Sequence, residues 1–178
     1  MRRLLPFLLL AACSAPPPAP APRPAPAAPP TIASPPPVAP EQPVTGQWAD
    51  MYADKGEWVY RQDERGSIAL FGEAGRDALF MLRCDKPRRR IFMSRAGEVW
   101  NADSVGMTIY TSSGRKTFTV RRTGATPPYV AIELDPKEPH LDAMAFSRGK
   151  FLATLAGRPN LVIPNWAEVG RVVEDCRI

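Results

Sequence analysis

The sequence predicts a mainly β domain, an antiparallel β-sandwich or barrel-like sheet with a short C-terminal helix, preceded by a signal peptide and a Pro/Ala-rich linker. Short apolar runs recur along residues 57–163, separated by turn residues. Several of these runs alternate apolar and polar residues at the period of a strand. Evenly spaced short strands are typical of sandwiches and barrels. The helix is predicted by apolar residues that recur at helical spacing after residue 165.

The first twelve residues have the order of a secretory signal. Two arginines precede an apolar run, residues 4–10, and two alanines follow it. A charged end, an apolar core and small residues in this order direct export. The run is much shorter than the about 20 residues that a membrane-spanning helix needs. We therefore expect a signal over residues 1–12.

The end of this signal carries a candidate lipidation site. Leu10-Ala11-Ala12-Cys13 resembles the lipobox of bacterial lipoproteins, in which diacylglycerol alkylates the cysteine thiol and the signal is removed. The resemblance implies a lipid anchor on Cys13, and Ser14 in place of an aspartate favours the outer membrane, facing the periplasm. The alternative is an ordinary signal with a chance cysteine. Several acyl chains, at about 0.8 kcal/mol per CH₂, would make the anchor effectively permanent.

Residues 13–44 read as a tether. They are dominated by Pro and Ala, which leaves little apolar surface to bury and few free amides, so we expect a disordered, polyproline II-like segment. At about 3.1 Å per residue it would reach roughly 90 Å when fully extended. The alternative is a ligand for proline-binding modules. The folded domain is then expected over residues 45–178.

Within the domain, strands are predicted over residues 57–62, 67–71, 78–84, 90–94, 107–112, 116–121, 129–134, 143–147, 151–155 and 161–163. In the strand 116–121, Phe118 and Val120 should share one face, with the threonines on the other. Ser113-Gly114 reads as a hairpin turn, and Arg148-Gly149 less clearly as another.

The predicted helix covers residues 166–175. Asn165 is the expected N-cap, with Glu168 three residues on, as in a variant of the capping box. The residues expected on its apolar face are Trp166, Val169, Val172, Val173 and Cys176.

With Cys13 lipidated, two cysteines remain, Cys84 and Cys176. An exported protein meets an oxidising compartment, so the simplest expectation is a disulfide between them. The alternative is a reactive thiol or a metal pair, but the chain has one histidine and no CxxC spacing, so we expect no metal site.

Charge gives the best candidate for binding. Outside the signal and linker the chain carries about +3, from 20 basic and 17 acidic residues, which is mild for a nucleic-acid binder. Two basic clusters stand out, Arg88-Arg89-Arg90 and Arg121-Arg122. Guanidinium groups suit carboxylates and phosphates, so the clusters are a candidate anion site, expected at one end of the sheet. Peptidoglycan, lipopolysaccharide and envelope proteins carry such groups. The alternative is a solvated edge that blunts strand pairing.

Catalytic groups are few, and we expect no catalytic residue and no cofactor. His140 is the only histidine and stands in a Lys-Glu-Pro-His turn, where we expect it at the surface. The expected function is therefore that of a membrane-anchored periplasmic lipoprotein with a non-catalytic β domain that binds an envelope component or a protein partner. The alternative is a cell-envelope hydrolase that uses carboxylates near His140. Its signature would be a cleft with Glu133, Asp135 or Asp142 beside the imidazole.

Residues 78–84, which end in Leu82-Arg83-Cys84, the strand 90–94 and a closing segment ending in Cys176 together resemble two kinds of small periplasmic protein. These are the invasion-associated protein B family and accessory proteins of type VI secretion. Both resemblances imply a non-catalytic β-sandwich domain. Residues 142–149 and 161–168 are similar to a group of uncharacterised lipoproteins of alpha-type proteobacteria, which implies no activity.

Overall fold

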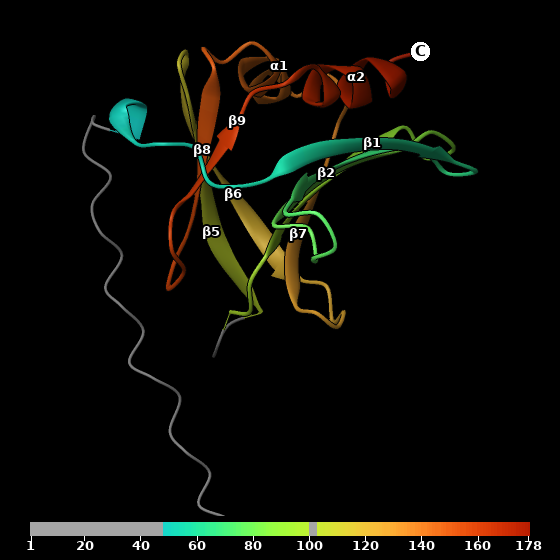
Figure 1. The fold of residues 1–178 in the computed structure, drawn as a ribbon. Helices are drawn as coiled ribbons and strands as arrows, with labels where there is room; N and C mark the ends of the chain where they lie inside the picture. The colour runs from blue at the N-terminus through green and yellow to red at the C-terminus, as the bar shows by residue number, and fades with distance from the viewer. Residues whose placement is uncertain (1–47, 100–102) are drawn as a thin grey trace, which may run out of the picture. The chain divides into compact units, whose positions relative to one another are not determined.

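The computed structural model describes residues 48–99 and 103–178. These residues form one antiparallel sheet of nine strands, which curls into a half-barrel, and two short helices lie across one end of it (Figure 1). The strand order is β1-β2-β3-β4-β7-β6-β5-β8-β9. The predicted fold class is therefore confirmed, as a single curled sheet. The signal, Cys13 and the tether lie outside the described residues.

The elements alternate with short turns along the chain. In order they are η1 (Trp48–Asp50), β1 (Glu57–Asp63), β2 (Gly66–Gly72), β3 (Phe80–Asp85), β4 (Arg90–Ala96), β5 (Ser104–Thr111), β6 (Gly114–Arg122), β7 (Tyr129–Leu134), α1 (Pro139–Ala145), β8 (Lys150–Leu155), β9 (Leu161–Pro164) and α2 (Ala167–Asp175).

The core lies on the inner face of the curl, and strand periodicity puts it there. In β6, Phe118 and Val120 are buried while the residues on either side of each are exposed, as predicted. The ring of Phe80 on β3 lies 6.4 Å from that of Trp58 on β1 and 5.7 Å from that of Phe151 on β8. Strands far apart in the sheet therefore meet through their inner faces, which is what a half-barrel requires.

The two edges of the sheet come together at a seam. Asp54, just before β1, donates its backbone N–H to the carbonyl of Val162 at 2.8 Å and accepts the N–H of Val162 on its side chain at 2.6 Å. Trp58 Nε1 donates to the carbonyl of Pro164 at 2.8 Å. These bonds satisfy polar groups on the β9 edge that would otherwise invite pairing with another chain.

The helices close one end of the half-barrel. Leu141 and Met144 of α1 are buried, as are Val169, Val172 and Val173 of α2, so each helix turns an apolar stripe to the core. The two helices also contact each other. The open end of the curl lies opposite them (Figure 1).

Several local predictions need correction. Residues 143–147 are not a strand, because α1 runs to Ala145; Pro139 occupies its first turn and the Glu138 side chain accepts the N–H of His140. Consequently Arg148-Gly149 joins a helix to β8 and is not a hairpin. The N-cap of α2 is Trp166, not Asn165, and its side chain makes no capping hydrogen bond. Trp166 is also 44% exposed, so it does not belong to the buried face of the helix as expected. The amide of Asn165 instead donates to the carbonyls of Ala145 and Ser147 at 2.9 and 2.7 Å.

Candidate functional site

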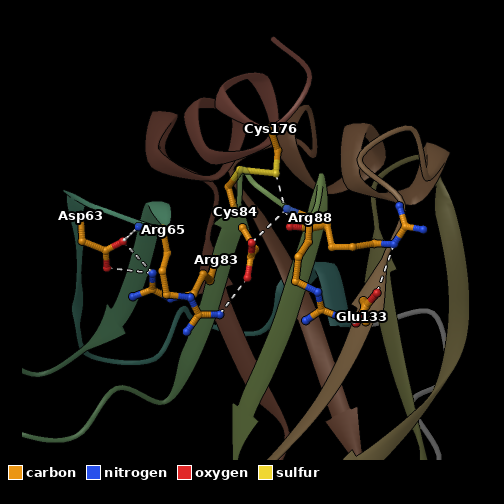
Figure 2. A network of polar contacts seen from close by, with 9 residues as sticks. Asp63, Arg65, Arg83, Cys84, Arg88, Glu133 and Cys176 are labelled. Atoms are coloured by element: carbon orange, nitrogen blue, oxygen red, sulfur yellow. Dashed lines mark hydrogen bonds and ion pairs between the residues drawn. A yellow bond between two sulfur atoms is a disulfide. The ribbon is translucent and has the colours of Figure 1, made fainter.

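Cys84 and Cys176 form the expected disulfide, with Cα atoms 5.4 Å apart. Cys84 lies near the end of β3, on its buried face, and Cys176 follows α2, so the bridge fastens the last helix to the third strand of the sheet (Figure 2). Both side chains are almost completely buried. The chain that follows, Arg177 and Ile178, is thereby held beside the turn between β3 and β4.

That turn carries the first predicted basic cluster. The carboxylate of Asp85 accepts the N–H of Arg88 at 3.2 Å and pairs with Arg65 at 3.0 Å; the hydrogen bond from Arg65 lowers the pKa of Asp85. Arg89 donates its N–H to the carbonyl of Lys86 and adopts φ of 51°. A left-handed backbone costs a non-glycine residue roughly 1–2 kcal/mol. Arg89 therefore stands where glycine would be favoured.

The three arginines of this cluster differ in their partners. Arg88 pairs with the carboxylate of Glu133 on β7 at 2.9 Å (Figure 2). Arg90 pairs with the same carboxylate at 3.1 Å. Arg90 also lies 3.9 Å from the carboxylate of Asp135, so two carboxylates face these two guanidinium groups. Arg89 is exposed, makes no ion pair with a described residue, and donates only to the carbonyl of Arg177 at 3.4 Å. Excess positive charge gathers around Arg89.

Arg89 opens onto a hollow of about 370 Å³, which we call the basic hollow. Three chain segments meet there: the start of β4, the loop after β7, and the end of the chain after α2. Arg177 is fixed by bonds to the carbonyl of Pro136 at 2.9 Å and to both oxygens of Asp142 at 2.8 and 3.1 Å. The lining residues are Arg89, Arg90, Asp135, Pro136, Lys137, Cys176 and Arg177.

The charges around the basic hollow do not balance. Lys137, like Arg89, is exposed and forms no ion pair with a described residue, and Asp135 is the one acid among the lining residues. Asp135 lies 3.9 Å from Arg90 and bonds the N–H of Lys137. An anion placed here would meet two cations, Arg89 and Lys137, that make no ion pair in the described part of the chain; Arg89 has one long hydrogen bond, to the carbonyl of Arg177.

The second predicted cluster is elsewhere, which corrects the expectation of one combined site. Arg121 and Arg122 pair with Ala131 and Val130 at the start of β7, whereas Arg90 lies beside its end. The two clusters are therefore separated by the length of a strand, roughly 17 Å. Arg121 and Arg122 line a wider cleft of about 600 Å³ at the open end of the half-barrel. Glu98 and Asp103 line the same cleft, so its charges balance.

His140 is buried, contrary to the expected surface position. Its Nε2 lies 3.1 Å from the carbonyl of Ile109, an acceptor only, so Nε2 carries the proton. Its ring packs edge-on against Phe118 at 5.8 Å, and burial lowers its pKa. The hydrolase alternative needed carboxylates beside this imidazole in a cleft. Glu133 and Asp142 instead pair with arginines, and none of the described clefts is lined by His140.

Sequence reasoning missed one buried charge, Arg95. It follows Ile91 and Met93 on the inner face of β4 and is 4% exposed. Its Nη2 donates to the carbonyl of Pro159, while Nε and Nη1 are buried without a partner among the described residues. Burial lowers its pKa to about 10, so the guanidinium stays charged at neutral pH. The inward periodicity of β4 was the signal that could have found it.

Comparisons with known proteins do not extend these observations. No family model, no curated protein and no solved structure matches the chain.

Within the described ranges, none of the helices has the length and apolar character that crossing a membrane requires. Residues 48–99 and 103–178 contain no group of three or more His, Cys, Asp or Glu side chains placed to hold a metal ion.

Proposed function

We propose that this chain is an exported lipoprotein, anchored to the outer membrane through Cys13, whose β domain binds an anionic group of the cell envelope in the basic hollow. The anchor is supported by the sequence Leu10-Ala11-Ala12-Cys13. The binding site is supported by one observation above the others. Arg89 keeps a bulky, charged side chain in a left-handed backbone position and lines the basic hollow, without an ion pair to any described residue. Strained residues of this kind cluster at functional sites.

Charge and shape define the ligand class. The basic hollow offers Arg89 and Lys137 from different segments, and Arg90 shares its one strong partner with Arg88. Carboxylate and phosphate groups fit such guanidinium donors. Peptidoglycan peptides carry the first, lipopolysaccharide carries the second, and envelope proteins carry carboxylates. Binding would be weak and salt-sensitive, because exposed ion pairs contribute about 0–1 kcal/mol each and are screened within about 8 Å.

The anchor is tested by mass spectrometry of the chain purified from membranes. We expect a mature protein that begins at Cys13 and carries lipid, and a Cys13→Ser variant that leaves the membrane fraction. A Cys13→Ser variant that still partitions wholly with membranes would contradict the anchor.

The binding site is tested with the Cys13→Ser chain against peptidoglycan fragments and lipopolysaccharide in parallel. Arg89→Ser with Lys137→Ser should weaken capture of one of these probes roughly 5- to 30-fold, equivalent to about 1–2 kcal/mol. The matched control is Arg121→Ser with Arg122→Ser, which removes the same formal charge at the other end of the sheet and should change capture little. Equal loss in both variants would reduce the effect to net charge and refute the site.

A further inference from the structure

Exposed aromatic side chains gather at one place on the domain. Of the six large hydrophobic residues exposed in the described ranges, four come from three neighbouring segments. Tyr52 is 96% exposed, Phe146 78%, Trp166 44% and Met51 37%. We call these four residues the aromatic patch. Single exposed apolar residues are ordinary, whereas a group of them marks an interaction surface.

Hydrogen bonds hold the three segments together. Lys150, at the start of β8, donates its ammonium to the carbonyl of Met51. The amide of Asn165, next to Trp166, donates to the carbonyls on either side of Phe146, at 2.9 and 2.7 Å. The N–H of Asn165 also bonds the carbonyl of Gly149 at 2.9 Å. These bonds tie the backbones of the three segments to one another, so the four side chains project from connected positions.

Position and composition together identify the occupant. The described domain begins at η1, directly before Met51 and Tyr52, so the segment that follows Cys13 joins the domain at the edge of the aromatic patch. Tyr and Trp are the residues that settle at the level of lipid headgroups. Two basic residues, Arg148 and Lys150, and two acidic residues, Asp50 and Glu168, lie next to the patch in the sequence, so its surroundings carry no net charge that would repel a bilayer. A tether raises the local concentration of the domain at the bilayer, so a few side chains suffice.

We infer that the aromatic patch rests on the bilayer in which Cys13 is anchored, with Tyr52, Phe146 and Trp166 at the headgroup level. This inference rests on the proposed lipid anchor, but not on the basic hollow. The orientation turns the seam and the adjoining helix ends to the membrane.

The test uses the lipidated full chain in phosphatidylethanolamine and phosphatidylglycerol vesicles, with and without brominated acyl chains, which quench tryptophan only at close range. We expect brominated lipid to quench the wild-type chain more than a Trp166→Phe variant, which keeps an apolar ring but removes the reporter. Tyr52→Ser with Phe146→Ser should abolish this difference. Val59→Ser removes an exposed hydrophobic residue of β1 outside the patch and should leave the difference unchanged.

The outcomes separate the two proposals. A chain without lipid at Cys13 would remove the anchor and overturn both the proposed anchoring and this inference. A lipidated chain whose Trp166 is not quenched would overturn the inference alone. Shielding of Trp166 by an added envelope protein, without quenching by brominated lipid, would assign the patch to a protein partner and overturn the bilayer as its occupant.

Discussion

Removing the disulfide should cost this domain a large part of its stability. The bridge closes a loop with a sequence separation of 92 residues. In the chain-entropy model, a loop of this size stabilises the folded state by about 4–5 kcal/mol through its effect on the unfolded chain. Domains of this size are stable by about 5–15 kcal/mol in total. Cys84→Ala with Cys176→Ala should therefore fold, but with a much smaller margin.

The measurement is urea unfolding followed by far-UV circular dichroism, on a Cys13→Ser background that leaves no third thiol. With a slope of about 1–3 kcal/mol per M urea, the midpoint should fall by roughly 2 M. The wild-type pair unfolded in a thiol-free reductant is the matched control and should match the double variant, since alanine in place of each sulfur opens only a small cavity. A loss below about 1 kcal/mol would refute the loop-entropy reasoning.

Three further predictions concern single side chains. Arg89→Gly should raise the free energy of unfolding by about 0.5–1 kcal/mol, because it relieves the left-handed backbone, while it weakens capture of the anionic probe; a destabilised variant would show that the side chain supports the turn. Arg95→Met should leave the free energy of unfolding unchanged or raise it by about 1–2 kcal/mol, since it replaces a buried charge that has two unpaired donors; a loss above about 2 kcal/mol would mean that the guanidinium is paired. Burial lowers the pKa of His140 in the folded state. As the pH falls, the unfolded chain therefore binds a proton on this imidazole at a higher pH than the folded chain does. The free energy of unfolding is then constant above a pH of about 6.5 and declines below it. His140→Gln, which keeps a donor for Ile109, should flatten the urea midpoint between pH 7 and 5, and an unchanged slope would contradict this assignment.

The strands were predictable because their information is local. Alternation in β6 placed Phe118 and Val120 inside without reference to the rest of the chain. The same reasoning failed at residues 143–147, because α1 has only seven residues and its two buried apolar residues, Leu141 and Met144, form too short a pattern to distinguish a helix from a strand. The start of α1 was nevertheless marked by Glu138-Pro139, since proline is favoured in the first turn of a helix.

The candidate site was half predictable. Clustering in the sequence identified Arg88, Arg89 and Arg90, but not their unequal pairing, because Glu133 reaches them only through the contact between β4 and β7. Lys137 and Arg177 belong to the basic hollow for the same long-range reason. Arg121 and Arg122 are not part of the basic hollow, because they lie beside the start of β7, whereas Arg90 lies beside its end. The sequence shows where charged residues cluster along the chain, whereas the order of the strands in the sheet decides which of them become neighbours.

The seam between Asp54, Trp58 and β9 also bears on how the chain reaches its fold. Its contacts join residues 106 and 108 positions apart, and β4 and β5 likewise await partners that come later in the chain. The chain loses the entropy of closing these large loops before the contacts between the distant residues can stabilise it. Folding is therefore slow relative to helical proteins, on the order of milliseconds to seconds. A chain cut short before β9 would leave the β8 edge unpaired and open to association with other chains. The half-barrel can therefore be completed only after β9, the last strand of the chain, has been synthesised.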